Sequence, residues 1–223
     1  RRAKIRRNHI GFIFQNFNLI GRMNVLENVS LPLLYKGVST VKRYERASEI
    51  LRYLGIQEKE YYLPSQLSGG QLQRAAIARA MVNRPSIVLA DEPTGNLDTK
   101  ATKVIMAALQ EIHNAGNTII MVTHNPDLAA YADRVITMID GRIEDEFTGE
   151  QLAAELKSQK QEAEQKAVPA TNNAIEPQPK KKHRNKNKKT KRKNSLTAKS
   201  TSAKSKKVIV TTKKSTPRKR KKQ

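Results

Sequence analysis

Residues 67–98, LSGGQLQRAAIARAMVNRPSIVLADEPTGNLD, are the most informative part of this chain about its fold. Its first half is rich in alanine and predicts a helix that begins after Ser68, a favourable N-cap residue. Gly69 and Gly70 place no side chain over the first turn, so the backbone N–H groups there stay accessible. Such groups at a helix N-terminus bind phosphate and other anions. The first half therefore predicts an anion-binding helix end.

The second half of the stretch predicts a strand that ends in two acids. Residues 86–90 (SIVLA) are mostly apolar, and Asp91 and Glu92 follow them directly. This places both carboxylates at the carboxyl edge of a sheet, where phosphoryl-transfer enzymes handle Mg²⁺ and an attacking water. Each half is common by itself, but their order and spacing together predict phosphate chemistry.

The whole stretch resembles the signature motif, the following helix, the Walker B strand and the D-loop of ATP-binding cassette (ABC) ATPases. Two further motifs stand in that family's order. Gln15 follows the strand-like HIGFIF and resembles the Q-loop glutamine, and His124 follows TIIMVT and resembles the H-loop histidine. The resemblance implies an α/β fold: a P-loop NTPase-like parallel sheet, truncated at the N-terminus, with an inserted helical subdomain.

The resemblance also implies a role for each polar residue at the sheet edge. Asp91 is expected to hold Mg²⁺, directly or through water, and Glu92 to be the general base for the hydrolytic water. Gln15 is expected to orient that water or to reach Mg²⁺. His124 is expected to donate an imidazole N–H to the γ-phosphate of ATP.

A second set of residues is expected to serve the nucleotide of a partner subunit. By the same resemblance, the signature residues face the γ-phosphate held by a second ABC ATPase subunit, in a homodimer or a heterodimer. These residues are Ser68, Gly69, Gly70 and Gln71. Asp98 resembles the D-loop aspartate that crosses between subunits. ATP then joins two half-sites, neither of which is complete alone.

The phosphate-binding loop of the family, G-x-x-x-x-G-K-[ST], is absent from the 223 residues, and none of the 10 glycines is followed by Lys. Most of the ATP affinity depends on that loop. Two explanations stay open: the N-terminal part is missing from this sequence, or the subunit serves only its partner's nucleotide. The abrupt start at Arg1 and the intact Glu92 favour a fragment. We expect the 223-residue chain alone to be inactive as an ATPase.

Composition and periodicity divide the chain into three parts. We expect a partial ABC ATPase domain at 1–147, in which a helical signature subdomain spans 24–83. A polar helix or linker is expected at 148–179. Residues 180–223 contain 21 Lys and Arg, no acid and no aromatic residue. Because such a segment cannot bury enough apolar surface to offset its ordering entropy, we expect it to be disordered.

The C-terminal part of the chain carries most of the net charge of +23, since residues 157–223 hold 24 Lys and Arg against 3 acids. Residues 180–223 are called the basic tail. It is interpreted as an anchor to anionic lipid, as a nucleic-acid contact, or as a solvated polycation without a specific partner. The absence of Cys excludes disulfide and thiolate chemistry. No apolar run approaches the ~20 residues that a membrane span needs.

Several segments resemble one subgroup of the family, the ATPases of macrolide, antimicrobial-peptide and lipoprotein-releasing transporters. They are FQNFNLI at 14–20, ENV at 27–29, LLYKG at 33–37, ADEPTGNLD at 90–98 and IMVTH at 120–124. In that subgroup the ATPase lies on the cytoplasmic face of the membrane under a permease and drives export of a peptide, drug or lipid-linked substrate. Two alternatives stay open: a permease-free ATPase that acts on nucleic acid or the ribosome, and a catalytically dead cassette that serves as a scaffold.

Overall fold

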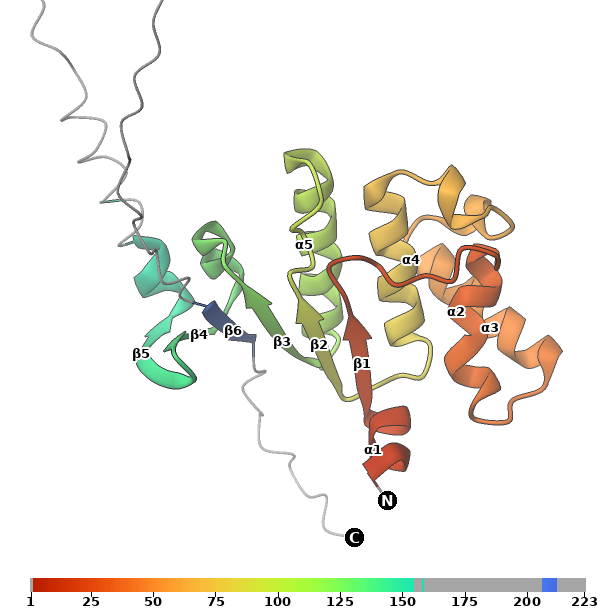
Figure 1. The fold of residues 1–223 in the computed structure, drawn as a ribbon, viewed down its shortest axis with the longest axis horizontal. Helices are drawn as coiled ribbons and strands as arrows, with labels where there is room; N and C mark the ends of the chain where they lie inside the picture. Colours follow the sequence, from red (N-terminus) through yellow and green to blue (C-terminus); the bar gives the residue numbers. More distant parts are fainter. Residues whose placement is uncertain (1, 155–157, 159–205, 212–223) are drawn as a thin grey trace, which may run out of the picture.

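The computed structural model describes residues 2–154, 158 and 206–211. They form an α/β domain in which one sheet lies beside a group of helices (Figure 1). The helices are α1 (Arg2–His9), α2 (Val25–Leu34), α3 (Thr40–Tyr53), α4 (Gly69–Met81) and α5 (Thr99–Asn114), with 3₁₀ helices η1 (Gln57–Lys59), η2 (Pro64–Gln66) and η3 (Pro126–Tyr131). The strands are β1 (Ile10–Ile13), β2 (Ile87–Asp91), β3 (Thr118–Thr123), β4 (Arg134–Ile139), β5 (Arg142–Thr148) and β6 (Lys206–Thr211).

The strand order in the sheet is β1-β2-β3-β6-β4-β5. β1, β2 and β3 are parallel neighbours, with Asp91 of β2 beside Val122 of β3. Their near-continuous apolar sequences suit parallel strands. β4 and β5 form an antiparallel hairpin, and the turn residues Asp140 and Gly141 have φ angles of 48° and 77°, as a type I′ turn requires. Because the three parallel strands run the same way, their carboxyl ends meet at one edge of the sheet.

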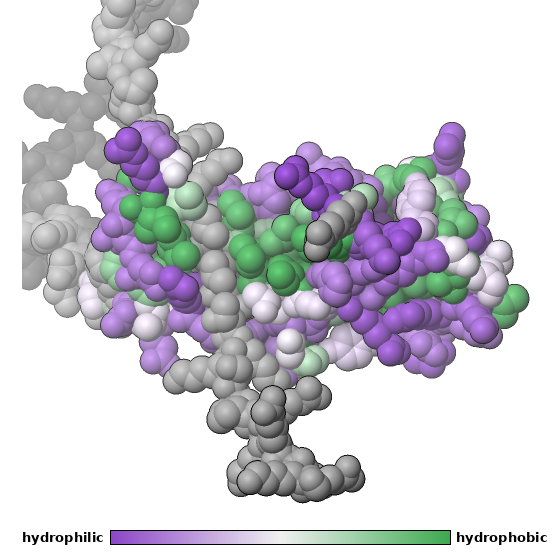
Figure 2. All heavy atoms as spheres, turned by 90° about the horizontal axis from the view of Figure 1, so that it is seen from below, coloured by the Kyte–Doolittle hydropathy of each residue, from purple (hydrophilic) through white to green (hydrophobic). Residues whose placement is uncertain are grey.

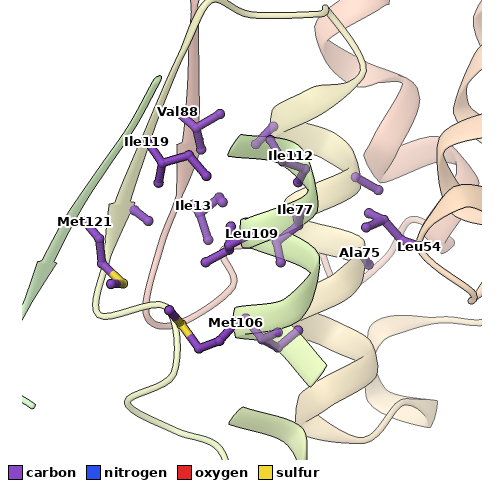
Figure 3. Packing of buried hydrophobic residues seen from close by; sticks show 14 of the residues in the cluster. Ile13, Leu54, Ala75, Ile77, Val88, Met106, Leu109, Ile112, Ile119 and Met121 are labelled. Atoms are coloured by element: carbon purple, nitrogen blue, oxygen red, sulfur yellow. The ribbon is translucent and has the colours of Figure 1, made fainter. Parts of the chain in front are cut away.

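The hydrophobic core lies between the parallel strands and the helices α4 and α5. Ile13, Val88 and Ile119 of the three strands pack near Ile77 of α4 and Leu109 of α5 (Figure 3). Each of these side chains is at most 4% exposed, and full burial of such a side chain stabilises the fold by about 1.5–3 kcal/mol. This core fixes the strands whose ends carry the predicted site residues.

A helical group lies beside the β1 side of the sheet and contains α2, α3 and α4 (Figure 1). α2 begins at a capping box, in which Asn24 Oδ1 accepts the Glu27 N–H and Glu27 Oε2 accepts the Asn24 N–H, each at 2.8 Å. α3 ends before Gly55, whose φ of 64° suits the residue after a helix. All three helices lie within residues 24–83, which we keep as the proposed extent of the signature subdomain.

β6 departs from the sequence expectation. It lies between β3 and β4 and pairs antiparallel with both, with Ile209 opposite Met121 and Val135. The expectation of disorder is therefore wrong for Lys206–Thr211. The physical reason is that this segment contains the β-branched run VIV, which favours a strand, and its backbone pairs with strand edges on both sides. The rest of 180–223 lies outside the described residues.

A short helical segment follows β5 at residues 149–154. At its start the Thr148 N–H donates to Gln151 Oε1 at 3.0 Å, and the Gln151 N–H donates to Thr148 Oγ1 at 3.2 Å. This helical segment lies within the helix or linker predicted for 148–179, and all of that range beyond residue 154 except Ser158 lies outside the described residues. In the part of the chain that the structure describes, no helix combines the length and apolar character needed to cross a membrane.

Candidate active site

Three of the predicted motifs meet at the carboxyl edge of the parallel strands. Gln15 follows β1, Asp91 ends β2 with Glu92 next to it, and His124 follows β3. Residues at this edge of a parallel sheet are brought together from segments far apart in the sequence. The sheet thus brings the four residues to one edge in the order of their strands.

The Glu92 carboxylate is held at several points. Its Oε2 accepts the hydroxyl proton of Thr123 at 2.9 Å, and its Oε1 accepts the backbone N–H of His124 at 2.8 Å. The Glu92 backbone has a left-handed φ of 45°, and its N–H donates to the Val122 carbonyl at 2.8 Å. A left-handed non-glycine residue is strained and persists where surrounding bonds fix it. The carboxylate is therefore preorganised rather than free to rotate.

His124 is paired with the same carboxylate. Its Nδ1 lies 2.7 Å from Glu92 Oε1, and the imidazole is 72% exposed whereas the Glu92 side chain is 16% exposed. When Glu92 is ionised, Nδ1 carries the proton of this bond. The opposite nitrogen, Nε2, then donates to a ligand only if the ring is protonated, because a neutral imidazole has a single N–H.

The signature residues lie at the N-terminal end of α4. Ser68 N donates to Gln71 Oε1 at 2.9 Å, and Gln71 N donates to Ser68 Oγ at 3.4 Å, which forms a capping box. A side chain added at Gly70 would lie 3.1 Å from Ala101 Cβ, and one at Gly69 would lie 3.3 Å from Leu97. The two glycines therefore also let the tip of α4 approach the start of α5.

A hollow of about 290 Å³ lies between the tip of α4 and the segment before α5. Its lining includes the four signature residues together with Arg74, Asn96 and Asp98. Asp98 Oδ1 accepts the Ala101 N–H at 2.7 Å, so this carboxylate is the N-cap of α5. The hollow adjoins the cluster at the sheet edge through Asn96, whose Nδ2 donates to the Gln15 carbonyl at 3.1 Å.

Gln15 lies against the segment after Glu92. A side chain added at Gly95 would come within 2.9 Å of Gln15 Nε2. Asn96 Nδ2 donates to Asn16 Oδ1 at 3.1 Å as well as to the Gln15 carbonyl. The predicted Q-loop and D-loop are therefore in direct contact.

The donor set at the sheet edge fits Mg²⁺. Asp91 is exposed at the end of β2, and the Gln15 amide offers a neutral oxygen. Within the described residues no three His, Asp or Glu side chains form a group that could hold a metal by themselves. Mg²⁺ usually takes one or two carboxylates plus phosphate oxygens and water, so a single carboxylate suits it when nucleotide supplies the rest.

Sequence reasoning missed three residues that hold this site: Thr123, Asn96 and Arg79. Thr123 is 1% exposed and bonds Glu92. Its position directly before His124 was a usable signal, whereas the contacts of Asn96 and Arg79 span 61 to 81 residues. Contacts of that separation depend on the fold and leave no local pattern.

Comparison with known proteins agrees with this geometry. A family model described as ABC transporter matches residues 1–95. The uncharacterized ABC transporter ATP-binding protein YvrO of Bacillus subtilis is 50% identical over 141 residues, which are 63% of this chain and 62% of that protein. The macrolide export ATP-binding/permease protein MacB of Hahella chejuensis is also 50% identical over 141 residues, which are 63% of this chain and 22% of that protein. Over these residues the chain is similar to ABC transporter ATP-binding proteins.

Solved ABC cassettes share the fold of this domain. The dimeric structure of the ABC transporter cassette MJ0796 has a TM-score of 0.59 and 45% identity, covering 66% of this chain and 65% of that chain. The cbiO1 structure from Clostridium perfringens has a TM-score of 0.63 and 29% identity, covering 71% and 64%. The predicted α/β ABC ATPase fold is confirmed. The chain spans less than two thirds of the length of YvrO, MacB and both cassettes.

Proposed function

We propose that this chain is an ATP-binding subunit that powers export through a membrane ABC transporter of the macrolide-export kind. The observation that carries the proposal is the fixed Glu92 carboxylate at the sheet edge, between Thr123 and His124. General-base catalysis needs such a carboxylate within hydrogen-bond reach of water. The MacB relatives, which are named as macrolide export ATP-binding/permease proteins, support export as the direction.

In this proposal Glu92 accepts the proton of the attacking water, and Thr123 keeps the carboxylate aimed at it. His124 faces the γ-phosphate with Nε2 while Nδ1 stays on Glu92. Asp91 would hold Mg²⁺, and the Gln15 amide would be a second ligand or a water-positioning group. Bound Mg²⁺ would neutralise charge on the phosphate oxygens.

The hollow at the tip of α4 is proposed to take the γ-phosphate of a nucleotide held by a second subunit. The exposed N–H groups at the start of α4 favour an anion, and Arg74 adds positive charge to the lining. This hollow is lined by the signature residues and Asp98, whereas Glu92 and His124 pair with each other beyond it. Two separate clusters in one domain suit an arrangement in which each subunit contributes to two nucleotides.

The proposal is tested by restoring a phosphate loop. The 223-residue chain is expected to show no ATP turnover, because the 223 residues contain no G-x-x-x-x-G-K-[ST]. A chimera with a segment carrying that motif placed before Arg1 is expected to hydrolyse ATP. Glu92→Gln in the chimera should abolish turnover and retain binding of a fluorescent ATP analogue.

The result that contradicts the proposal is a chimera that binds ATP but turns over equally with Glu92 and with Glu92→Gln. Glu58→Gln, on the exposed side of η1, is the matched control and should leave turnover unchanged. Turnover by the unmodified chain would instead contradict the expectation that it is inactive alone.

A permease is the proposed membrane partner, and a groove between β1 and α2 is the proposed contact. The groove has a volume of about 600 Å³. Phe12, Phe14 and Tyr35 line it and are 40%, 37% and 71% exposed. Arg6 and Arg7 also line it. Such a surface suits an amphipathic segment with acidic residues at its ends. Figure 2 shows how apolar and hydrophilic residues are distributed over one face of the domain.

Tyr35→Ala is expected to weaken co-purification with a co-expressed permease of the macrolide-export kind. Tyr61→Ala is the matched control, since Tyr61 is 72% exposed and lies outside this groove. Equal retention of the permease by both variants would count against the groove. Co-sedimentation of the chain with ribosomes, and no permease capture, would favour the permease-free alternative.

The basic tail is proposed to add affinity for anionic lipid next to the permease. Each Lys or Arg near an anionic membrane contributes on the order of 1 kcal/mol. Removal of residues 212–223, which lie beyond β6, should weaken binding to phosphatidylserine vesicles at low salt. Unchanged vesicle binding would remove the lipid proposal, and binding to RNA instead would favour the nucleic-acid alternative.

A further inference from the structure

The loop after β1 is held by a cation from the signature helix. Arg79 of α4 donates from Nη2 to the Phe17 carbonyl at 2.8 Å and from Nη1 to the Asn18 carbonyl at 2.5 Å. These contacts link residues 61 and 62 positions apart in the sequence. The planar guanidinium suits two adjacent acceptors at once.

The two residues that Arg79 holds are strained. Phe17 has a φ of 60° and Asn18 a φ of 50°, both in the left-handed region. Asn tolerates this region, but an aromatic residue adopts it rarely and at a cost. A hydrogen bond that forms only in the left-handed conformation can offset the cost of that conformation. The Arg79 guanidinium forms such bonds with the carbonyls of both Phe17 and Asn18.

Among the residues that the structure describes, Arg79 has no acidic partner that would otherwise explain its position. Burial lowers the pKa of the Arg79 guanidinium, and in the described part of the chain the ion pairs involve other residues. A part-buried cation without a carboxylate is costly unless polar groups compensate it. The carbonyls of Phe17 and Asn18 supply that compensation.

The rest of the loop is held by neutral groups. Asn28 of α2 is fully buried and bonds the Ile20 N–H at 2.7 Å and the Ile20 carbonyl at 3.1 Å. Asn96 bonds the Gln15 carbonyl at the other end. Arg79 alone among these three ties the middle of the loop to α4, the helix whose N-terminal end carries the signature residues.

We infer that Arg79 is a positioning residue that makes the place of Gln15 depend on the place of α4. Arg79 lies 11 residues after Ser68, which corresponds to roughly 16 Å along the helix. A shift of α4 that follows contact at its tip would therefore move the Phe17 and Asn18 carbonyls and, with them, Gln15. The inference rests on the proposed function and deepens it. It couples the hollow at the tip of α4, which would face the partner's nucleotide, to Gln15, which would face this subunit's own nucleotide.

The test is amide hydrogen exchange on the full 223-residue chain without nucleotide, so it does not depend on ATPase activity. Arg79→Gln is expected to raise the exchange rates of the Asn18 and Ile20 amides by at least about tenfold. The reason is that loss of one hydrogen bond from a charged donor changes the opening equilibrium of the loop by more than tenfold. The amides of α4 that face the core should stay protected. Arg79→Lys, which keeps the charge but loses the fork, should give an intermediate increase.

Arg74 provides the matched control. It lies on the same helix and donates from Nη1 to the carbonyls of Leu54 and Gly55, at 3.2 and 2.8 Å, after α3. Arg74→Gln should raise exchange near residues 54–56 and leave residues 17–20 unchanged. Unchanged exchange at 17–20 in a folded Arg79→Gln variant would overturn the inference.

A second variant keeps the inference testable if Arg79→Gln does not fold. Phe17→Gly removes the strain that the Arg79 fork offsets, because glycine adopts the left-handed region freely. In an Arg79→Lys background, Phe17→Gly should lower exchange at Asn18 again by several fold. If Phe17→Gly changes the exchange rate at Asn18 equally in the Arg79 and Arg79→Lys backgrounds, the Arg79 side chain does not offset the strain at Phe17. The inference would then be wrong.

Discussion

Glu92 and His124 are bonded through a single oxygen: Glu92 Oε1 accepts the backbone N–H of His124 at 2.8 Å and lies 2.7 Å from its Nδ1. The two residues follow neighbouring parallel strands, β2 and β3. Their pairing therefore depends on strand register, since a slip of one residue would turn one of the side chains to the other face. The proposed general base and the proposed phosphate contact are one structural unit.

Thr123→Val is predicted to loosen this unit. The Thr123 hydroxyl donates to Glu92 Oε2 and accepts the Asn125 N–H at 3.1 Å, so valine removes the Thr123 bond from both the carboxylate oxygen and the amide. We expect a loss of about 1–3 kcal/mol in the free energy of unfolding, measured by urea denaturation. Thr118→Val at the start of the same strand is the control, and an equal loss in both variants would contradict the prediction.

Gly95→Ala is predicted to displace Gln15 while it leaves the fold intact. The added carbon would lie 2.9 Å from Gln15 Nε2, the far end of a flexible side chain, so the side chain can move at low cost. We expect a shift of the Gln15 side-chain amide resonance and a stability change below about 1 kcal/mol. At Gly21 an added carbon meets nothing within 4 Å, and Gly21→Ala should leave that resonance in place.

Gly11→Ala is predicted to destabilise the domain, because its added carbon meets backbone. It would lie 2.6 Å from the Ala80 carbonyl oxygen and 3.2 Å from Pro85 Cγ. β1 and α4 would have to separate, which costs about 1–3 kcal/mol, again measured by urea denaturation. If Gly11→Ala lowers the free energy of unfolding no more than Gly21→Ala does, then β1 and α4 can separate without cost and the prediction is wrong.

Ser68→Ala is predicted to weaken the start of α4. Loss of an N-cap usually costs about 0.5–2 kcal/mol, and the long Ser68–Gln71 bond of 3.4 Å places this cap at the low end. Thermal unfolding followed by circular dichroism measures the change. Ser65→Ala in η2 is the control, since Ser65 caps no α-helix, and a similar effect from both would argue against a capping role for Ser68.

Most elements were predictable from local sequence. The apolar run TIIMVT predicts a strand at 118–123, which matches β3. Apolar residues at helical spacing predict helices at 40–54 and 99–115, which match α3 and α5 within one residue at each end. Apolar periodicity and caps set these elements, and both are written in consecutive residues. α1 and β6 were not expected: α1 buries no residue and leaves no apolar stripe, and β6 depends on pairing with strands more than 60 residues away.

Short runs of neighbouring residues, each with its own chemistry, were enough to predict the family resemblance, the order of the motifs and the candidates Gln15, Asp91, Glu92 and His124. How these candidates are held follows from the fold: Thr123 and His124 bond Glu92, Asn96 bonds the Gln15 carbonyl, and Arg79 bonds the middle of the loop. Hydrogen bonds of this kind join groups that strand register and helix packing bring together, so no local pattern encodes them.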